Sequence, residues 1–193
     1  MVLPIPVGDN LRQRGFPRFT LLILLTCLAA FAWARYFCTD LSTCVVDRCA
    51  LVPADALALG QSVLADPAAA LAQPELLLRR GAAPLFGHLF LHATELHLLG
   101  NMVFLWVFGR GLERRLGGWR FLLFYLLCGV AAAAVHLALH PGSRVPMVGA
   151  SGAIAGLLGG YLLLFPRARI HLVIWAILPL EAQAPAFVFI LIW

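Results

Sequence analysis

Four apolar runs of nearly membrane-spanning length decide the solvent in which this chain folds. They cover residues 19–35, 96–109, 120–139 and 148–165. A helix needs about 20 apolar residues to cross a bilayer, and lipid leaves few alternatives to a helix. The chain is 62% hydrophobic and 12% charged, whereas soluble domains are about half apolar and a quarter charged. We therefore expect an all-α, polytopic bundle of membrane helices in the lipid bilayer.

The first run has two interpretations. Residues 1–18 are polar and carry Arg12, Arg14 and Arg18 ahead of it, an order that is also typical of a signal peptide. The length of the run and the further runs downstream favour a retained first span that enters from the cytoplasm. Residues 1–18 are then a cytoplasmic N-terminus, residues 19–193 a membrane domain, and residues 36–95 its outer loop.

The arginines support this orientation. The formal charge is +5, the chain has no lysine, and the arginines lie between apolar runs instead of along one polar face. This pattern disfavours nucleic-acid binding and fits the positive-inside rule. With the N-terminus inside, nine of the fourteen arginines are cytoplasmic: Arg12, Arg14, Arg18, Arg110, Arg114, Arg115, Arg120, Arg167 and Arg169.

The last segment predicts an incomplete fifth span. Residues 170–184 are apolar but interrupted by Pro179 and Glu181, so we expect an interfacial connection there. A fifth span over residues 185–193 would be about 13 Å long, less than half of a hydrocarbon core of about 30 Å. We therefore expect the chain to be truncated at its C-terminus, with four full spans and the start of a fifth.

Cys38, Cys44 and Cys49 lie in the outer loop. One disulfide with one remaining thiol is possible in an oxidising compartment, and loop cysteines without a catalytic role are the simpler alternative. A metal site is disfavoured because no histidine or CxxC pair accompanies them. We expect neither a metal nor another cofactor.

The fourth run opens with Gly149-Ala150-Ser151-Gly152, and glycine recurs at 152, 156 and 160. Such a stripe is typical of close helix packing in membranes, and a serine within it is equally consistent with catalysis. His97 and Asn101 are four residues apart on one face of the second span. Polar groups at membrane depth are costly unless they face the bundle interior or a water-filled cavity. In an out-to-in second helix they share the depth of Ser151.

Several motifs in order resemble the rhomboid family of intramembrane serine proteases. They are Phe90-Leu91-His92, His97 to Asn101, Gly109 to Glu113 with Gly117, Gly149 to Ala153, and Pro166 to Arg169. The resemblance implies cleavage of transmembrane protein substrates, with Ser151 as nucleophile and with His97, Asn101 and the Ser151 N–H holding the oxyanion. It also implies close packing of Gly149, Gly152 and Gly156 around the active site, and location in a bacterial inner membrane. His88 and His92 are expected to be structural or adjacent to substrate, and Glu113 to pair with an arginine.

The family's general base, a histidine on a sixth span, has no counterpart in this chain. His136 and His140 lie at a possible depth but match no motif, and His171 is too distant. A Ser–Lys dyad is excluded because lysine is absent, an aspartyl protease because every aspartate precedes residue 67, and a zinc protease because His-Glu-x-x-His does not occur.

A rhomboid-like protein that binds transmembrane helices without cutting them remains the alternative. A transporter is disfavoured because no broken-helix pair or inverted repeat is present.

Overall fold

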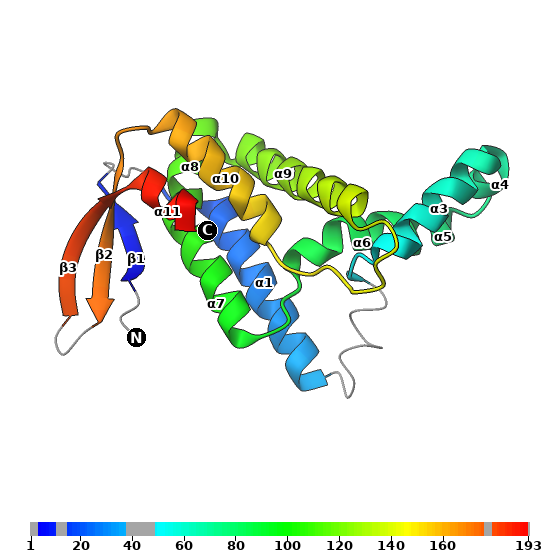
Figure 1. Cartoon of the computed structure of the whole chain (residues 1–193), viewed down its shortest axis with the longest axis horizontal. Coiled ribbons are helices and arrows are strands. Elements are labelled where there is room, and N and C mark those ends of the chain that lie inside the picture. Colours follow the sequence, from blue (N-terminus) through cyan, green and yellow to red (C-terminus); the bar gives the residue numbers. More distant parts are fainter. Residues whose placement is uncertain (1–3, 11–14, 38–48, 176–178, 193) are drawn as a thin grey trace.

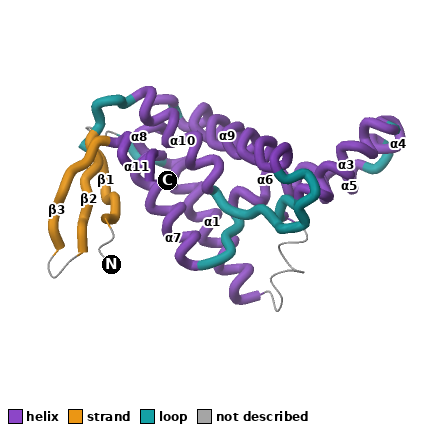
Figure 2. Tube along the Cα trace, in the orientation of Figure 1, coloured by secondary structure: helices purple, strands orange, loops and turns teal. Residues whose placement is uncertain are grey.

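The computed structural model describes residues 4–10, 15–37, 49–175 and 179–192, most of which are helical. The bundle consists of α1 (Arg18–Phe37), a long helix that begins at Glu95, α9 (Gly118–Leu139) and α10 (Ser151–Leu164). Figures 1 and 2 show these helices side by side, with the β-sheet at one end of the bundle and the short helices that follow α1 at the other.

The long helix runs through three consecutive pieces, α7 (Glu95–Phe104), η4 (Leu105–Gly109) and α8 (Arg110–Leu116). The backbone stays helical at both joints, with φ −57° and ψ −43° at Leu105 and at Arg110. The middle piece is a π-helical turn, a local widening of an α-helix. The helix stops before Gly117, which has φ +84°, a conformation that glycine adopts without strain. The second span expected over residues 96–109 is therefore the first part of a longer helix.

Two helices of the described chain, α1 and α9, are long and apolar enough to cross a membrane, and α10 is apolar but shorter. Both long helices turn apolar side chains outward. On α9, Phe121 and Tyr125 are fully buried, whereas Leu123, Leu127 and Leu139 are more than half exposed. A water-soluble surface rarely carries so many exposed leucines, and lipid accommodates them.

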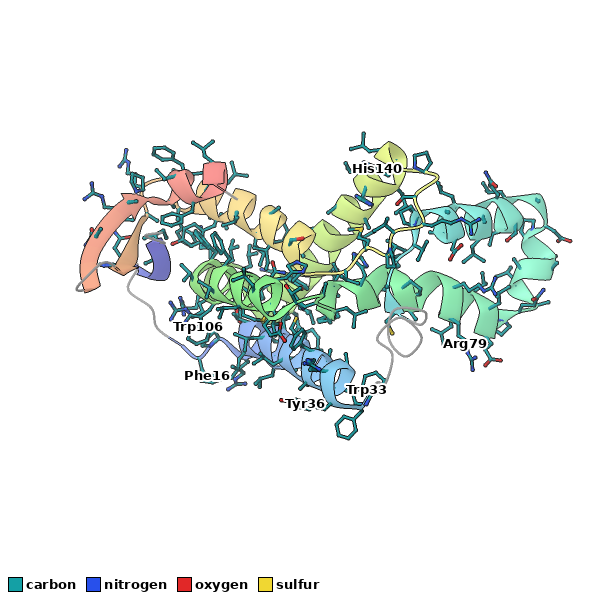
Figure 3. All side chains as sticks on the ribbon, turned by 60° about the horizontal axis from the view of Figure 1, so that its bottom comes forward. Phe16, Trp33, Tyr36, Arg79, Trp106 and His140 are labelled. Atoms are coloured by element: carbon teal, nitrogen blue, oxygen red, sulfur yellow. The ribbon has the colours of Figure 1, made fainter. Side chains whose placement is uncertain are left out.

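Aromatic side chains mark both ends of α1. Figure 3 shows Trp33 and Tyr36 near its C-terminal end and Phe16 beside its N-terminal end. Tyr36 is 82% and Phe16 69% exposed. Aromatic residues are enriched where a membrane helix meets the lipid headgroups, so the length of α1 between these residues matches the thickness of a bilayer core.

The glycine stripe of α10 is its interface with α9. A Cβ atom on Gly152 would lie 2.6 Å from Cβ of Ala132, and one on Gly156 would overlap the Cys128 side chain. One turn further on, a Cβ on Gly160 would lie 2.9 Å from the Phe124 ring. The partners on α9 also recur every four residues, so two straight stripes face each other. Side-chain-free positions let membrane helices approach closely and gain van der Waals contact.

A three-stranded antiparallel sheet includes residues 170–175 and 179–184, within the segment 170–184 where an interfacial connection was expected, so the fold is not all-α. It consists of β1 (Pro4–Asp9), β2 (Arg169–Trp175) and β3 (Pro179–Pro185) in the order β1-β2-β3. Pro179, which suggested a break, begins an edge strand, where its missing N–H is tolerated. On its other edge β2 pairs with β1, which comes from the N-terminal segment. No local sequence pattern predicts this long-range pairing. The short helix α11 (Ala186–Ile192) follows β3.

The end of the bundle beside this sheet, which we call the arginine end, carries Arg18, Arg110, Arg114, Arg115, Arg120, Arg167 and Arg169. Glu113 is buried there and accepts hydrogen bonds from Phe19 N, Thr20 N and Thr20 Oγ1 at 2.7 to 2.9 Å. This carboxylate caps the first turn of α1, where N–H groups lack intrahelical acceptors, and its charge also acts on the neighbouring Arg114. The Tyr161 hydroxyl donates to Asp9 Oδ2 at 2.8 Å, which joins α10 to β1.

The segment expected as an outer loop is largely helical. It contains α3 (Pro53–Ala65), α4 (Pro67–Leu71), α5 (Pro74–Leu77), η2 (Leu78–Ala82), α6 (Ala83–Gly87) and η3 (His88–Phe90). Proline occupies one of the first two positions of α3, α4, α5 and α6, where it costs no hydrogen bond. Cys49 has a free thiol, whereas Cys38 and Cys44 lie outside the described residues.

Candidate active site

An open groove of about 590 Å³ lies between α7 and α10, at the end of the bundle opposite the arginine end. The described residues that line it are Leu96, His97, Gly100, Asn101, Ser151, Gly152 and Ala155. The groove therefore brings together the serine, the histidine and the asparagine that the sequence singled out. Leu96, Gly100 and Ala155 were not singled out. Gly100 and Ala155 could have been found from the helical repeat, since Gly100 lies three residues after His97 and Ala155 four residues after Ser151. Leu96 has no such spacing to a predicted site residue.

Ser151 is the first residue of α10 and is half-buried. The fourth span was expected from residue 148, but Val148 and Gly149 approach the helix in a loop. Ala150 precedes the first helical residue as the N-cap, so the N–H groups of the first turn have no acceptor within the helix. They also form the positive end of the helix dipole. The Ser151 hydroxyl thus lies beside backbone donors that favour negative charge.

Gly149 fixes how this loop meets α7. Its φ is +119°, a backbone conformation that strains any residue with a side chain. Its N–H donates to the carbonyl oxygen of His88 at 2.8 Å. A Cβ atom at this position would lie 2.7 Å from Cε1 of His97 and 3.7 Å from Nδ2 of Asn101. The backbone leading to Ser151 therefore lies directly against both candidate oxyanion donors.

His97 stands in the first turn of α7 and is half-buried. Thr94 is the N-cap of this helix, and its Oγ1 accepts a hydrogen bond from the His97 N–H at 3.2 Å. The ring of His92 meets the ring of His97 edge-on, with 5.2 Å between their centroids. The His97 imidazole is thus held between the His92 ring and the Gly149 backbone.

Asn101 is 2% exposed, and its Nδ2 has no hydrogen-bond partner among the described residues. A buried amide donor without an acceptor costs on the order of 1–3 kcal/mol. Such a donor is available to an oxygen atom of a ligand in the groove. Because Asn101 lies one helical turn beyond His97, both side chains lie on the same face of α7 and line the same groove.

Two further histidines are buried behind the groove. His92 is 5% exposed, and burial, reinforced by the neighbouring His97, lowers the pKa of His92 to about 4. Burial also lowers the pKa of His88, although the Pro84 carbonyl contacts Nδ1 of its ring at 2.9 Å. Both imidazoles are neutral near pH 7. Neither is among the described residues that line the groove.

The described groove lining holds no second titratable side chain besides His97. His136 and His140 lie at the C-terminal end of α9, and His171 lies in β2 at the arginine end. The groove residues therefore include a serine hydroxyl and two side chains, His97 and Asn101, that can donate hydrogen bonds. A serine hydroxyl also needs a base to become a strong nucleophile.

Comparison with known proteins gives the family. Residues 79–193, more than half of the chain, match the family model of the rhomboid domain. The chain is 35% identical over 97 residues to the mitochondrial rhomboid protein 1 of Saccharomyces cerevisiae, a segment that covers 48% of this chain and 28% of the yeast protein.

Two relatives from Bacillus subtilis are also similar. The identity to the rhomboid protease GluP is 42% over 72 residues, covering 37% of this chain and 14% of GluP. The identity to the putative rhomboid protease YdcA is 45% over 74 residues, covering 38% of this chain and 37% of YdcA. The chain thus spans well under half the length of these three relatives. It is an integral membrane protein that belongs to the rhomboid family.

Proposed function

We propose that this protein is an intramembrane serine endopeptidase that cleaves transmembrane protein substrates, with Ser151 as its nucleophile. The observation that carries the proposal is the shared groove of Ser151, His97 and Asn101 between α7 and α10. Three relatives of the chain carry the word protease in their names. The groove also offers two groups that acyl transfer needs, a serine hydroxyl and hydrogen-bond donors for the oxyanion.

In this mechanism Ser151 Oγ attacks the scissile carbonyl of a substrate segment that lies in the groove. The carbonyl oxygen becomes an oxyanion and accepts hydrogen bonds from the Ser151 N–H, His97 and Asn101 Nδ2. Loss of one such donor costs about 2.7–4 kcal/mol of transition-state stabilisation. Asn101 is suited to this role because its buried amide has no other acceptor among the described residues.

The general base in this proposal is a histidine from outside these 193 residues, as the resemblance to the family implies. One side of α10 is open to receive a further helix. Ala155 is exposed, and a Cβ atom on Gly159 would meet nothing within 4 Å. A helix on this side would carry its histidine toward Ser151. The 193-residue chain by itself is therefore expected to be inactive.

The test is cleavage of a reporter transmembrane substrate by the full protein encoded by the gene, including any residues beyond 193. Ser151→Ala is expected to abolish cleavage, because no other nucleophile lines the described part of the groove. Ser62→Ala is the matched control, since Ser62 lies on α3 and, among the described residues, its hydroxyl donates only to the local Leu59 carbonyl. Equal cleavage by wild type and Ser151→Ala would refute the assignment.

The second candidate is a protein that binds transmembrane helices without cutting them. The observation that favours it is that the described groove lining holds no titratable side chain other than His97, the candidate oxyanion donor. A fluorophosphonate probe separates the candidates, because it labels an activated serine. Labelling of the full protein that disappears in Ser151→Ala supports the enzyme. Binding of a transmembrane peptide without any labelling supports the binding protein.

The proposed orientation puts the arginine end in the cytoplasm and Ser151 near the outer surface. Seven of the described arginines gather at the arginine end, in keeping with the positive-inside rule. The Bacillus subtilis relatives support a bacterial inner membrane as the location.

A further inference from the structure

His136 and His140 form a pair that the proposed reaction does not use. They stand four residues apart at the C-terminal end of α9, His136 in its last turn and His140 directly after Leu139. Residues four apart in a helix project from the same face. Figure 3 shows His140 at the tip of α9, away from the groove between α7 and α10. The pair is therefore open to a ligand of its own.

The two imidazoles already lie side by side. Their ring centroids are 4.8 Å apart and their planes are inclined by only 20°. Neither ring makes a hydrogen bond to a protein group among the described residues, so all four ring nitrogens are available. His136 is half-buried and His140 is exposed, which leaves room for solvent or an ion next to both rings.

The electrostatics of this position favour a cation. The C-terminal end of a helix carries the partial negative charge of its unpaired carbonyl groups. The backbone N–H of His140 satisfies one of them, the carbonyl of His136, at 2.9 Å. The remaining carbonyls of the last turn face the same end of α9 as the two rings.

Paired imidazoles bind transition metals through their ring nitrogens. Imidazole nitrogen suits Zn²⁺, Cu²⁺ and Ni²⁺, with affinity rising toward Cu²⁺, and Zn–N bonds measure about 2.0–2.1 Å. Rotation of the two side chains directs one nitrogen of each ring to a common ion from their present spacing of 4.8 Å. No cluster of three or more histidine, cysteine or acidic side chains occurs among the described residues, so water molecules would complete the coordination.

We propose that His136 and His140 bind one divalent transition-metal ion, with the preference Cu²⁺ over Ni²⁺ and Zn²⁺, at the end of α9 that leads toward Ser151. The ion ties the last turn of α9 to the loop of residues 140–150. That loop is anchored by hydrogen bonds of Ser143 with His140 and Ala54, of Met147 with Leu51, and of Gly149 with His88. The bound ion therefore restrains one end of a loop whose other end presents Ser151.

The test measures binding of Cu²⁺ and Ni²⁺ to the purified protein in detergent, by calorimetry and by the electron paramagnetic resonance of Cu²⁺. A polyhistidine tag must be absent, because it would bind the same ions. We expect one ion per chain and a Cu²⁺ spectrum with nitrogen ligands. His136→Asn and His140→Asn should each weaken the affinity at least about 10-fold, the smallest effect seen even for residues that only support metal ligands.

His171→Asn is the matched control, because it removes a single histidine from β2 at the opposite end of the molecule. It should leave affinity and stoichiometry unchanged. The proposal is overturned if the wild type binds no Cu²⁺ or if the double variant His136→Asn/His140→Asn binds it with unaltered affinity. In both cases the stacked pair is a surface contact only. Because the readout is binding, neither outcome bears on the role of Ser151.

Discussion

Gly149 sets the geometry of the groove more directly than any other single residue, because its backbone touches both predicted oxyanion donors. Two independent constraints exclude a side chain at this position. The backbone φ is +119°, and the His97 ring occupies the space that a Cβ atom would need. The sequence identified Gly149 through its motif. The reason for the glycine, close contact with His97, becomes visible only in three dimensions.

Gly149→Ala is therefore predicted to impair both folding and cleavage. The forced left-handed backbone costs on the order of 1–3 kcal/mol, and displacement of His97 by about 1 Å costs about 100-fold in rate. Cleavage by the full protein and its melting temperature report the two effects. Gly142→Ala is the control, because a Cβ on Gly142 meets nothing within 4 Å. Normal cleavage by Gly149→Ala would contradict the proposed contact.

His92 gives the protein a predicted pH dependence. Its pKa is lowered from the ordinary 6.5 to about 4, so the folded protein binds a proton there less readily than the unfolded chain. Stability therefore falls as the pH drops from 6.5 toward 4 and is fully present above 6.5. His92→Phe removes this titration while keeping a ring of similar size. Part of the slope remains because the pKa of His88 is lowered too.

The measurement is the melting temperature of the purified protein between pH 4 and pH 7. The fall on acidification should be smaller for His92→Phe than for the wild type, and should be unchanged for His140→Phe at an exposed site. These samples contain a chelator to remove metal ions. If the melting temperature fell equally steeply with pH in the wild type and in His92→Phe, the pKa of His92 would not be lowered by folding.

At the scale of elements, the contact with α9 holds α10, the helix that begins at Ser151, in position. Gly156 faces Cys128 so closely that a Cβ would overlap its side chain. Gly156→Ala is predicted to separate the helices and to destabilise the protein by about 1–3 kcal/mol, the usual cost of overpacking. Unfolding in mixed detergent measures the change.

Two further variants make this test specific. Cys128→Gly should restore much of the stability lost in Gly156→Ala, because the nearest remaining atom of that residue, its Cα, lies 3.7 Å from the place that the new Cβ would occupy. In the 193-residue chain, where a Cβ on Gly159 meets nothing within 4 Å, Gly159→Ala should be neutral or stabilising by about 0.5–1 kcal/mol, since alanine favours helix. Equal loss at positions 156 and 159 would contradict the stripe as the interface.

For the whole molecule, the uneven distribution of arginines is the feature that bears on orientation. The turn at Gly117 and the loop at Gly142 lie at opposite ends of α9, and both glycines are exposed. A short epitope inserted after Gly142 is predicted to be accessible to antibody on intact cells or spheroplasts. The same epitope after Gly117 should be accessible only after permeabilisation. The reverse pattern would invert the proposed orientation.

Apolar runs, arginine positions and the motifs around His97 and Ser151 were enough to predict the solvent, the family and the polar residues that line the groove. These features are local, because helix formation in lipid depends on consecutive apolar residues and a helical face on residues three or four apart.

The β-sheet, the Glu113 cap on α1 and the closeness of Gly149 to His97 were decided by the tertiary structure alone. In each, groups more than 50 residues apart in the chain satisfy one another. The partner is then set by how whole elements pack, and the sequence around either group carries no record of it. The sequence determined which apolar segments become the helices of the bundle and which residues are candidates for the site, and packing determined what holds them in position.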